Sequence, residues 1–164
     1  MGLLVCSRLA VPRLTPRRAF RQLAKLSELR MVNVAANSLS GSLPPQYTNL
    51  SQLQVLYVQA NRLDGALPEQ IGGLGDLRFL NASDNNISGT LPYSLGELGD
   101  LQELTLFENS LTGDLPNELG KLAGLRSMMI NDNKLNGNLT EFSALGELRK
   151  LTLLDLYNNE MFGE

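Results

Sequence analysis

A leucine pattern recurs along the chain every 24 residues and constrains the fold more than any other feature. Its copies begin at Leu29, Leu53, Leu77, Leu101, Leu125 and, after an interval of 26 residues, Leu151. Each copy follows L-x-x-L-x-L-x-x-N-x-L-x-G-x-L-P or a close variant of it. Units of this length bury their apolar side only by stacking on one another, so the pattern predicts a solenoid. We expect about six turns, at residues 29–52, 53–76, 77–100, 101–124, 125–150 and a partial 151–164.

The fourth and sixth positions of each copy are apolar and lie two residues apart, which places them on one face of a short strand. These pairs are Val32/Val34, Leu56/Val58, Leu80/Ala82, Leu104/Leu106, Met128/Ile130 and Leu154/Leu156. We expect this face to point into the core. The strands of successive turns are predicted to pair in parallel and to form one long sheet.

The ninth position is asparagine in every copy, and the thirteenth is glycine. An asparagine side chain both donates and accepts, so it can bridge backbone groups that the turn buries. We expect a structural asparagine ladder at Asn37, Asn61, Asn85, Asn109, Asn133 and Asn159. The glycine is expected to take a backbone conformation that a Cβ would resist. The Leu-Pro pair that follows begins the return across the convex side, where proline favours an extended segment over a long helix.

With the motif L-x-x-L-x-x-L-x-L-x-x-N-x-L-x-G-x-L-P-x-x-L-G-x-L, residues 26–164 resemble the plant-type leucine-rich-repeat family. Its members include ectodomains of receptor-like kinases, receptor-like proteins and polygalacturonase-inhibiting proteins. The resemblance implies an α/β solenoid, a right-handed superhelix with a parallel concave sheet, and a protein- or peptide-binding role. The chain lacks the family's cysteine-paired cap and stops within a repeat, so we expect a fragment. In the fifth copy Thr140 replaces the proline and two residues are added, which we interpret as an insertion on the convex side.

Composition bears on the classes of function. The chain has no histidine and one cysteine, Cys6, so it lacks the commonest general base and any internal disulfide. We find no motif with catalytic spacing, and we predict a non-enzymatic protein without cofactor or metal. Residues 1–30 carry seven basic residues against one acid, whereas residues 31–164 carry seven against sixteen. The acidic body argues against nucleic acid as a partner, and no apolar run is long enough to span a bilayer.

The basic head is interpreted as two segments. Residues 1–16 are expected to be a disordered or targeting-like leader, and residues 17–28 a short amphipathic helix that covers the first repeat. An organelle transit peptide and a wrongly assigned start codon are alternatives for the leader. Myristoylation at Gly2 is disfavoured because Cys6 stands where the signal needs Ser or Thr.

Positions 3, 5, 7 and 8 of each copy point away from the core and are predicted to form the concave, ligand-binding face. The residues expected there are Val55, Tyr57, Gln59, Phe79, Asn81, Ser83, Asp84, Glu103, Thr105, Phe107, Glu108, Met129, Asn131, Asp132, Asp155 and Tyr157. The four aromatic residues in this set are candidate anchors for a partner.

Asp84, Glu108 and Asp132 form a column of one acid per turn, which favours a partner with a basic segment. Three alternatives stay open. The first is that the aromatics serve only for packing across strands. Arg78 and Arg126 could neutralise the acids locally, and the acids could bind calcium, although one carboxylate per turn is a thin ligand set.

Four N-x-S/T sequons, at Asn49, Asn81, Asn86 and Asn138, are possible N-glycosylation sites. They favour an extracellular or plasma-membrane-attached protein; a cytoplasmic or organellar location is the alternative. The resemblance to the leucine-rich-repeat family implies the ligand-recognition part of a receptor-like protein or receptor-like kinase. We expect a monomer or a ligand-induced complex. The alternative is an intracellular scaffold or a soluble enzyme inhibitor of the same fold.

Overall fold

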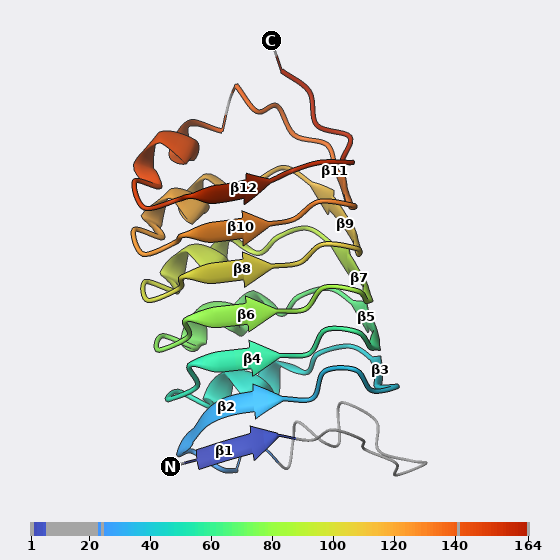
Figure 1. Cartoon of the computed structure of the whole chain (residues 1–164), viewed down its shortest axis with the longest axis vertical. Helices are drawn as coiled ribbons and strands as arrows, with labels where there is room; N and C mark the ends of the chain where they lie inside the picture. Colours follow the sequence, from blue (N-terminus) through green and yellow to red (C-terminus); the bar gives the residue numbers. More distant parts are fainter. Residues whose placement is uncertain (1, 6–22, 24, 141, 164) are drawn as a thin grey trace.

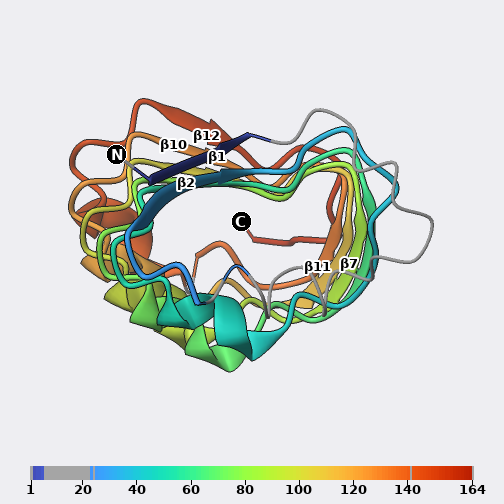
Figure 2. The ribbon, with the colours of Figure 1, turned by 90° about the horizontal axis from the view of Figure 1, so that it is seen from below.

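The computed structural model describes residues 2–5, 23, 25–140 and 142–163. Over these residues the chain winds through similar turns that stack along one axis (Figure 1). Viewed along that axis, the turns superpose as a loop with two strand-bearing sides and one helical side (Figure 2). The predicted solenoid with a long parallel sheet is confirmed.

Seven parallel strands form the longer sheet, in the order β1-β2-β4-β6-β8-β10-β12. Their bounds are Gly2–Val5 (β1), Leu29–Asn33 (β2), Val55–Tyr57 (β4), Phe79–Asn81 (β6), Glu103–Thr105 (β8), Ser127–Met129 (β10) and Leu153–Asp155 (β12). From β2 onward the register joins equivalent positions of the repeat. Leu80, for example, pairs with Leu56 on one side and with Leu104 on the other. Each position of the repeat therefore makes a row across the sheet.

Strand β1 lies in the segment for which the sequence predicts a disordered or targeting-like leader. Residues 2–5 instead pair in parallel with β2, with Val5 opposite Asn33. The edge of β2 offers unpaired backbone donors and acceptors, and a short run of Leu and Val suits a strand that satisfies them. Residues 6–22 and 24, which include most of the predicted helix 17–28, lie outside the described residues, and residues 25–28 lie in a turn region.

The core fills the space that the turns enclose. At the fourth position, residues from Val32 to Met128 are at most 1% exposed, whereas Leu154 on the last strand is 36% exposed. Each inner turn is covered by a turn on both sides, but Leu154 is covered on one side only. Burying a leucine fully contributes about 2 kcal/mol relative to leaving it in water. The stacking of turns is thus the main source of stability.

A second parallel sheet, which the sequence analysis does not anticipate, follows the first around each turn. Its order is β11-β9-β7-β5-β3, with bounds Ser40–Gly41 (β3), Arg62–Gly65 (β5), Asn86–Gly89 (β7), Ser110–Gly113 (β9) and Lys134–Leu135 (β11). One leucine or isoleucine in most of these strands is buried, as Leu63 and Ile87 are. The glycines that end β5, β7 and β9 have φ of 71°, 79° and 78°. This left-handed backbone resists a Cβ, as expected, and turns the chain toward the convex side.

Short 3-10 helices cover the third side of each turn. They are Pro45–Asn49 (η1), Glu69–Gly73 (η2), Tyr93–Glu97 (η3), Asn117–Lys121 (η4) and Ser143–Glu147 (η5). Extended prolines precede the first four, and Phe142 precedes η5. None of the described helices has the length and apolar character needed to cross a bilayer.

From Asn61 onward, the ninth-position asparagines bridge neighbouring turns in the bend between the two sheets, and the amide of Asn37 donates to Val34 and Ala35 of its own turn. The Asn85 amide donates to the carbonyls of Val58, Ala82 and Ser83 at 3.1, 3.2 and 3.0 Å. Its Oδ1 accepts the Leu63 N–H at 2.9 Å. The equivalent Oδ1 contacts recur at Asn61, Asn109, Asn133 and Asn159. Each side chain therefore satisfies backbone groups of its own turn and of the turn before it.

Replacing Asn85 with Ala is expected to destabilise the fold by about 3 kcal/mol, because it removes one hydrogen bond from each of three carbonyls and takes the acceptor away from the buried Leu63 N–H. Urea denaturation followed by circular dichroism measures the loss. Asn86→Ala is the matched control, since Asn86 is the next residue and is exposed. Equal effects of the two substitutions would contradict the bridging role.

Tyr47 takes the core position in the first full turn that Ile71 and Leu95 take in the next two. The residue is fully buried. Burial raises the pKa of its phenol far above the usual value near 10, because the phenolate cannot be solvated there.

This burial predicts a loss of stability at high pH. Above pH 10 the unfolded chain releases the Tyr47 proton and the folded chain does not, so the free energy of unfolding falls by about 1.4 kcal/mol per pH unit from this group. Below pH 10 the contribution is constant. Tyr47→Phe should flatten the decline measured by urea denaturation between pH 9 and about 11.5. Tyr93→Phe, at an exposed residue, should leave the slope unchanged.

Candidate functional site

The outer side of the longer sheet carries the residues expected to bind a ligand, and we call it the strand face. Most of them are half-buried or exposed there: Val55, Tyr57, Gln59, Phe79, Asn81, Asp84, Glu103, Phe107, Glu108, Met129, Asn131, Asp132, Asp155 and Tyr157. They form rows because β4, β6, β8, β10 and β12 pair in register. A chain lying across the strands would meet one residue of each row per turn.

Two residues expected on this face are buried. Ser83 is 2% exposed and Thr105 is 5% exposed. Thr105 is small and lies between Asn81 and Met129 of the adjoining strands, whose larger side chains leave it little access to solvent. The Ser83 hydroxyl donates to Asn81 Oδ1 at 2.7 Å. Neither side chain is available to a ligand, so both are removed from the candidate site.

Four aromatic residues lie on the strand face. Tyr57, Phe79 and Phe107 are half-buried, and Tyr157 is 76% exposed. Half-burial fixes a ring in place and leaves one side of it open, which suits a contact surface. The first three come from neighbouring turns in the middle of the stack, and Tyr157 follows β12 at one end.

The phenol of Tyr57 stays protonated over the physiological range. Partial burial raises its pKa above the usual value, and the carboxylate of Glu103 on the same face raises it further. The hydroxyl is therefore a permanent hydrogen-bond donor beside a negative charge. This pair favours a ligand that presents an acceptor near a positive group.

The acidic column stands at the point where the chain leaves the sheet. Asp84, Glu108 and Asp132 have left-handed φ of 51°, 52° and 54°, as do the other eighth-position residues. Such a conformation costs about 1 kcal/mol for a residue with a Cβ. It is held by hydrogen bonds between turns, such as Asp84 N–H to the Phe107 carbonyl at 3.0 Å. The repeat pattern does not predict this strain, although Asp or Asn at three of the six positions is a signal for it.

The three acids differ in how free they are. Asp132 accepts from the amides of Asn131 and Asn158 at 2.6 and 2.8 Å. Asp84 and Glu108 are exposed, and within the described residues their carboxylates have no partner. Among the described residues, no three histidine, cysteine or acidic side chains converge as a metal site would need. The column therefore offers two free negative charges and one that is tied to the surface.

Fifth-position side chains fix the backbone beside the face. Asn33, Asn81 and Asp155 each accept, through Oδ1, the N–H two residues later, at 3.1, 3.0 and 3.1 Å. This local turn is one that Asn and Asp commonly make. One oxygen of Asn81 and one of Asp155 are thus already engaged, which reduces what they can offer to a ligand.

Comparison with known proteins places this geometry in a family. A model of the leucine-rich repeat region matches residues 8–164. The chain belongs to the plant-type leucine-rich-repeat family. No curated protein matches the sequence significantly.

Solved structures of plant receptor ectodomains resemble this leucine-rich-repeat chain. The ectodomain of the Arabidopsis thaliana membrane receptor kinase GASSHO1/SCHENGEN3, in complex with CASPARIAN STRIP INTEGRITY FACTOR 2, is 41% identical over 87% of this chain, with a TM-score of 0.84. PEPR1 with AtPEP1 is 32% identical over 90%, with a TM-score of 0.83. The Arabidopsis receptor kinase HAESA, in complex with the peptide hormone IDA and the co-receptor SERK1, is 31% identical over 84%, with a TM-score of 0.80.

This leucine-rich-repeat chain spans only a part of those structures. It covers 17% of the GASSHO1/SCHENGEN3 chain, 20% of the PEPR1 chain and 23% of the HAESA chain. This chain shares the family and the fold of these relatives, and each of the three was solved together with a protein or peptide partner.

Proposed function

We propose that this chain is the ligand-recognition part of a plant receptor-like protein or receptor-like kinase, and that it holds an extended peptide against the strand face. The observation that carries the proposal is the likeness to receptor ectodomains solved with their ligands, HAESA with a peptide hormone among them. The same solenoid, with aromatic rings on the exposed side of three successive turns, supports a recognition role over a purely structural one.

The aromatic rings supply the anchors in this proposal. Tyr57, Phe79 and Phe107 are each held by the sheet and open on one side, so a ligand gains contact area with little loss of side-chain freedom. Because they come from three successive turns, a peptide must cross several strands to reach all three. An extended peptide has the length and shape for that path.

The free acids supply charge selection. The carboxylates of Asp84 and Glu108 stand one turn apart, and Glu103 adds a third exposed carboxylate on the same face. Opposite charge on the ligand would relieve their mutual repulsion and speed association. We therefore propose that the peptide carries a basic segment, and that the chain is a monomer until the ligand recruits a partner.

The sequons support a location outside the cell. Asn49, at the end of η1, and Asn86, at the start of β7, are exposed and lie away from the strand face. Glycans at these positions would leave the face open. We propose that the protein is extracellular or attached to the plasma membrane.

Peptide display tests the binding proposal. A random peptide library is selected on the immobilised chain, and each enriched peptide is measured by fluorescence anisotropy. Tyr57→Ala and Phe107→Ala should each weaken binding about 30-fold, the loss expected for an anchor worth about 2 kcal/mol. Asp84→Asn with Glu108→Gln should weaken binding of basic peptides and reduce its dependence on salt.

Leu145→Ala is the control, since Leu145 is an exposed apolar residue of η5 and does not belong to the strand face. Thermal unfolding of every variant verifies that the fold is kept. Peptides whose affinity is unchanged in the two strand-face aromatic variants would overturn the assignment of the face.

Glycan analysis tests the location. Protein purified from its natural source should carry N-glycans at Asn49 and Asn86, seen as deamidation at these residues after enzymatic release and tandem mass spectrometry. When the chain is secreted from a plant cell line, replacing Asn49 and Asn86 with Gln should lower its mass by the mass of those glycans. Natural protein without glycan at either residue would contradict an extracellular location.

A further inference from the structure

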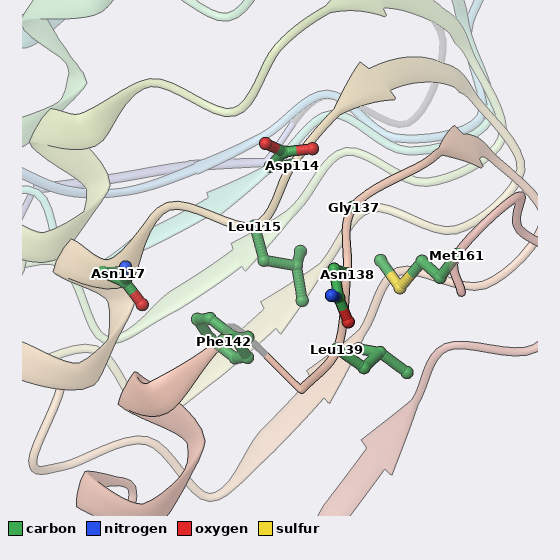
Figure 3. Close-up of a pocket in the computed structure, with 8 residues that line it drawn as sticks. All are labelled: Asp114, Leu115, Asn117, Gly137, Asn138, Leu139, Phe142 and Met161. Carbon is green, nitrogen blue, oxygen red and sulfur yellow. The ribbon is translucent and has the colours of Figure 1, made fainter. Parts of the chain in front are cut away.

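A hollow surface lies where the chain passes from β9 into η4. It consists of two adjoining hollows, of about 160 and about 500 Å³, which share Asp114, Leu115 and Asn117. The smaller one extends to Asn138 and Phe142 of the next turn and is drawn in Figure 3. None of these residues belongs to the strand face.

The smaller hollow arises where the fifth turn departs from the repeat. In the fourth turn Pro116 leads directly into η4, whereas in the fifth Thr140 stands in the place of proline and Phe142 precedes η5. Strand β11 ends at Leu135, opposite Gly113 at the end of β9, and Asn138 pairs with Phe162 of the following turn. The Leu-Pro pair that leads into the 3-10 helix in the preceding turns is therefore missing beside this hollow.

The smaller hollow has an apolar floor and a polar rim. Leu115 and Phe142 are buried, and Met161 is partly buried. Figure 3 shows Leu115, Phe142 and Asn138 grouped in the middle of the hollow, with Asp114 at its upper edge. A volume of about 160 Å³ accommodates one long side chain rather than a peptide backbone.

The lack of a side chain at Gly137 positions the carboxylate of Asp114. A Cβ at Gly137 would lie 3.0 Å from Asp114 Cα and 3.1 Å from its Oδ1, closer than such contacts usually allow. This glycine is not among those with left-handed φ, so a close approach, and not backbone conformation, explains it. Asp114 therefore rests directly on the turn that forms the hollow.

The two hollows carry negative charge without compensation. Their lining includes the carboxylates of Asp114 and Glu118 and no arginine or lysine. Within the described residues, neither carboxylate is paired with a basic group. The larger hollow also includes Tyr93, which is 69% exposed and can stack on a cationic or apolar group.

We propose that this surface binds a basic peptide, with one arginine side chain in the smaller hollow and the flanking residues in the larger one. The arginine stem would pack on Leu115 and Phe142 while its guanidinium meets Asp114 at the rim. Arginine fits better than lysine because its planar fork can bond a carboxylate twice. The site is independent of the strand face, so it goes beyond the function proposed above.

Titration with a minimal probe tests the proposal. Acetyl-arginine-N-methylamide is added to the isotope-labelled chain, and amide chemical shifts are followed by NMR. Shifts should concentrate on Asp114, Asn117, Gly137 and Asn138. The neutral citrulline analogue should bind at least about tenfold more weakly, since it keeps the shape and loses the charge.

Matched variants separate this site from the strand face. Asp114→Asn should weaken binding of the arginine probe about tenfold, whereas Asp64→Asn, the same change at an exposed residue of β5, should not. Tyr57→Ala should also leave the arginine probe unaffected. Equal affinity for the citrulline analogue, or full binding to the Asp114→Asn variant, would overturn the proposal even if peptide binding to the strand face holds.

Discussion

Several backbone groups in and beside the bend between the two sheets are bonded by an asparagine side chain and not by a neighbouring strand, and the structure depends on these bonds. The ninth-position asparagine of the following turn makes these bonds. Asn85 donates to the Val58 carbonyl and accepts from the Leu63 N–H, both in the turn before it. No turn can complete its own hydrogen bonds alone. A slip of one residue between turns would break these bonds and turn buried leucines outward at the same time. The bridge therefore sets the register of both sheets and, through it, the rows of the strand face.

The bend also decides what the strand face can present. A left-handed residue at the eighth position turns the chain out of the first sheet, and three of these positions are acids. Their charges therefore stand at the border of the face and not among the rings. The fifth-position Asn81 and Asp155 use one oxygen to hold the same bend. Structural need thus leaves Asp84, Glu103 and Glu108 as the carboxylates most available for recognition.

Much of this molecule follows from the repeat, because one residue per turn at a constant spacing is enough to infer stacking, the core and the exposed rows. The second sheet could not be predicted from the repeat. Its strands have only two to four residues, which is too short to show the alternation of apolar and polar residues that identifies a strand. The burial of Ser83 and Thr105 depends on the size of side chains on neighbouring turns, which a single-turn pattern ignores. The hollow beside Asp114 lies at the irregular fifth turn. The repeat pattern shows that residues are inserted there, but it does not show the shape that the turn takes.

The burial of the inner turns has a consequence for motion. The fourth-position residues Leu56, Leu80 and Leu104 are at most 1% exposed, and in a stack each unit is stabilised by its nearest neighbours. Opening one inner turn therefore also uncovers the turns beside it, so the amide protons of β4, β6 and β8 should exchange slowly and together. Tyr57 and Phe79 lie in these strands, and Phe107 follows β8 directly. The three rings therefore belong to one cooperative unit, and a ligand that meets one of them finds the other two already in place.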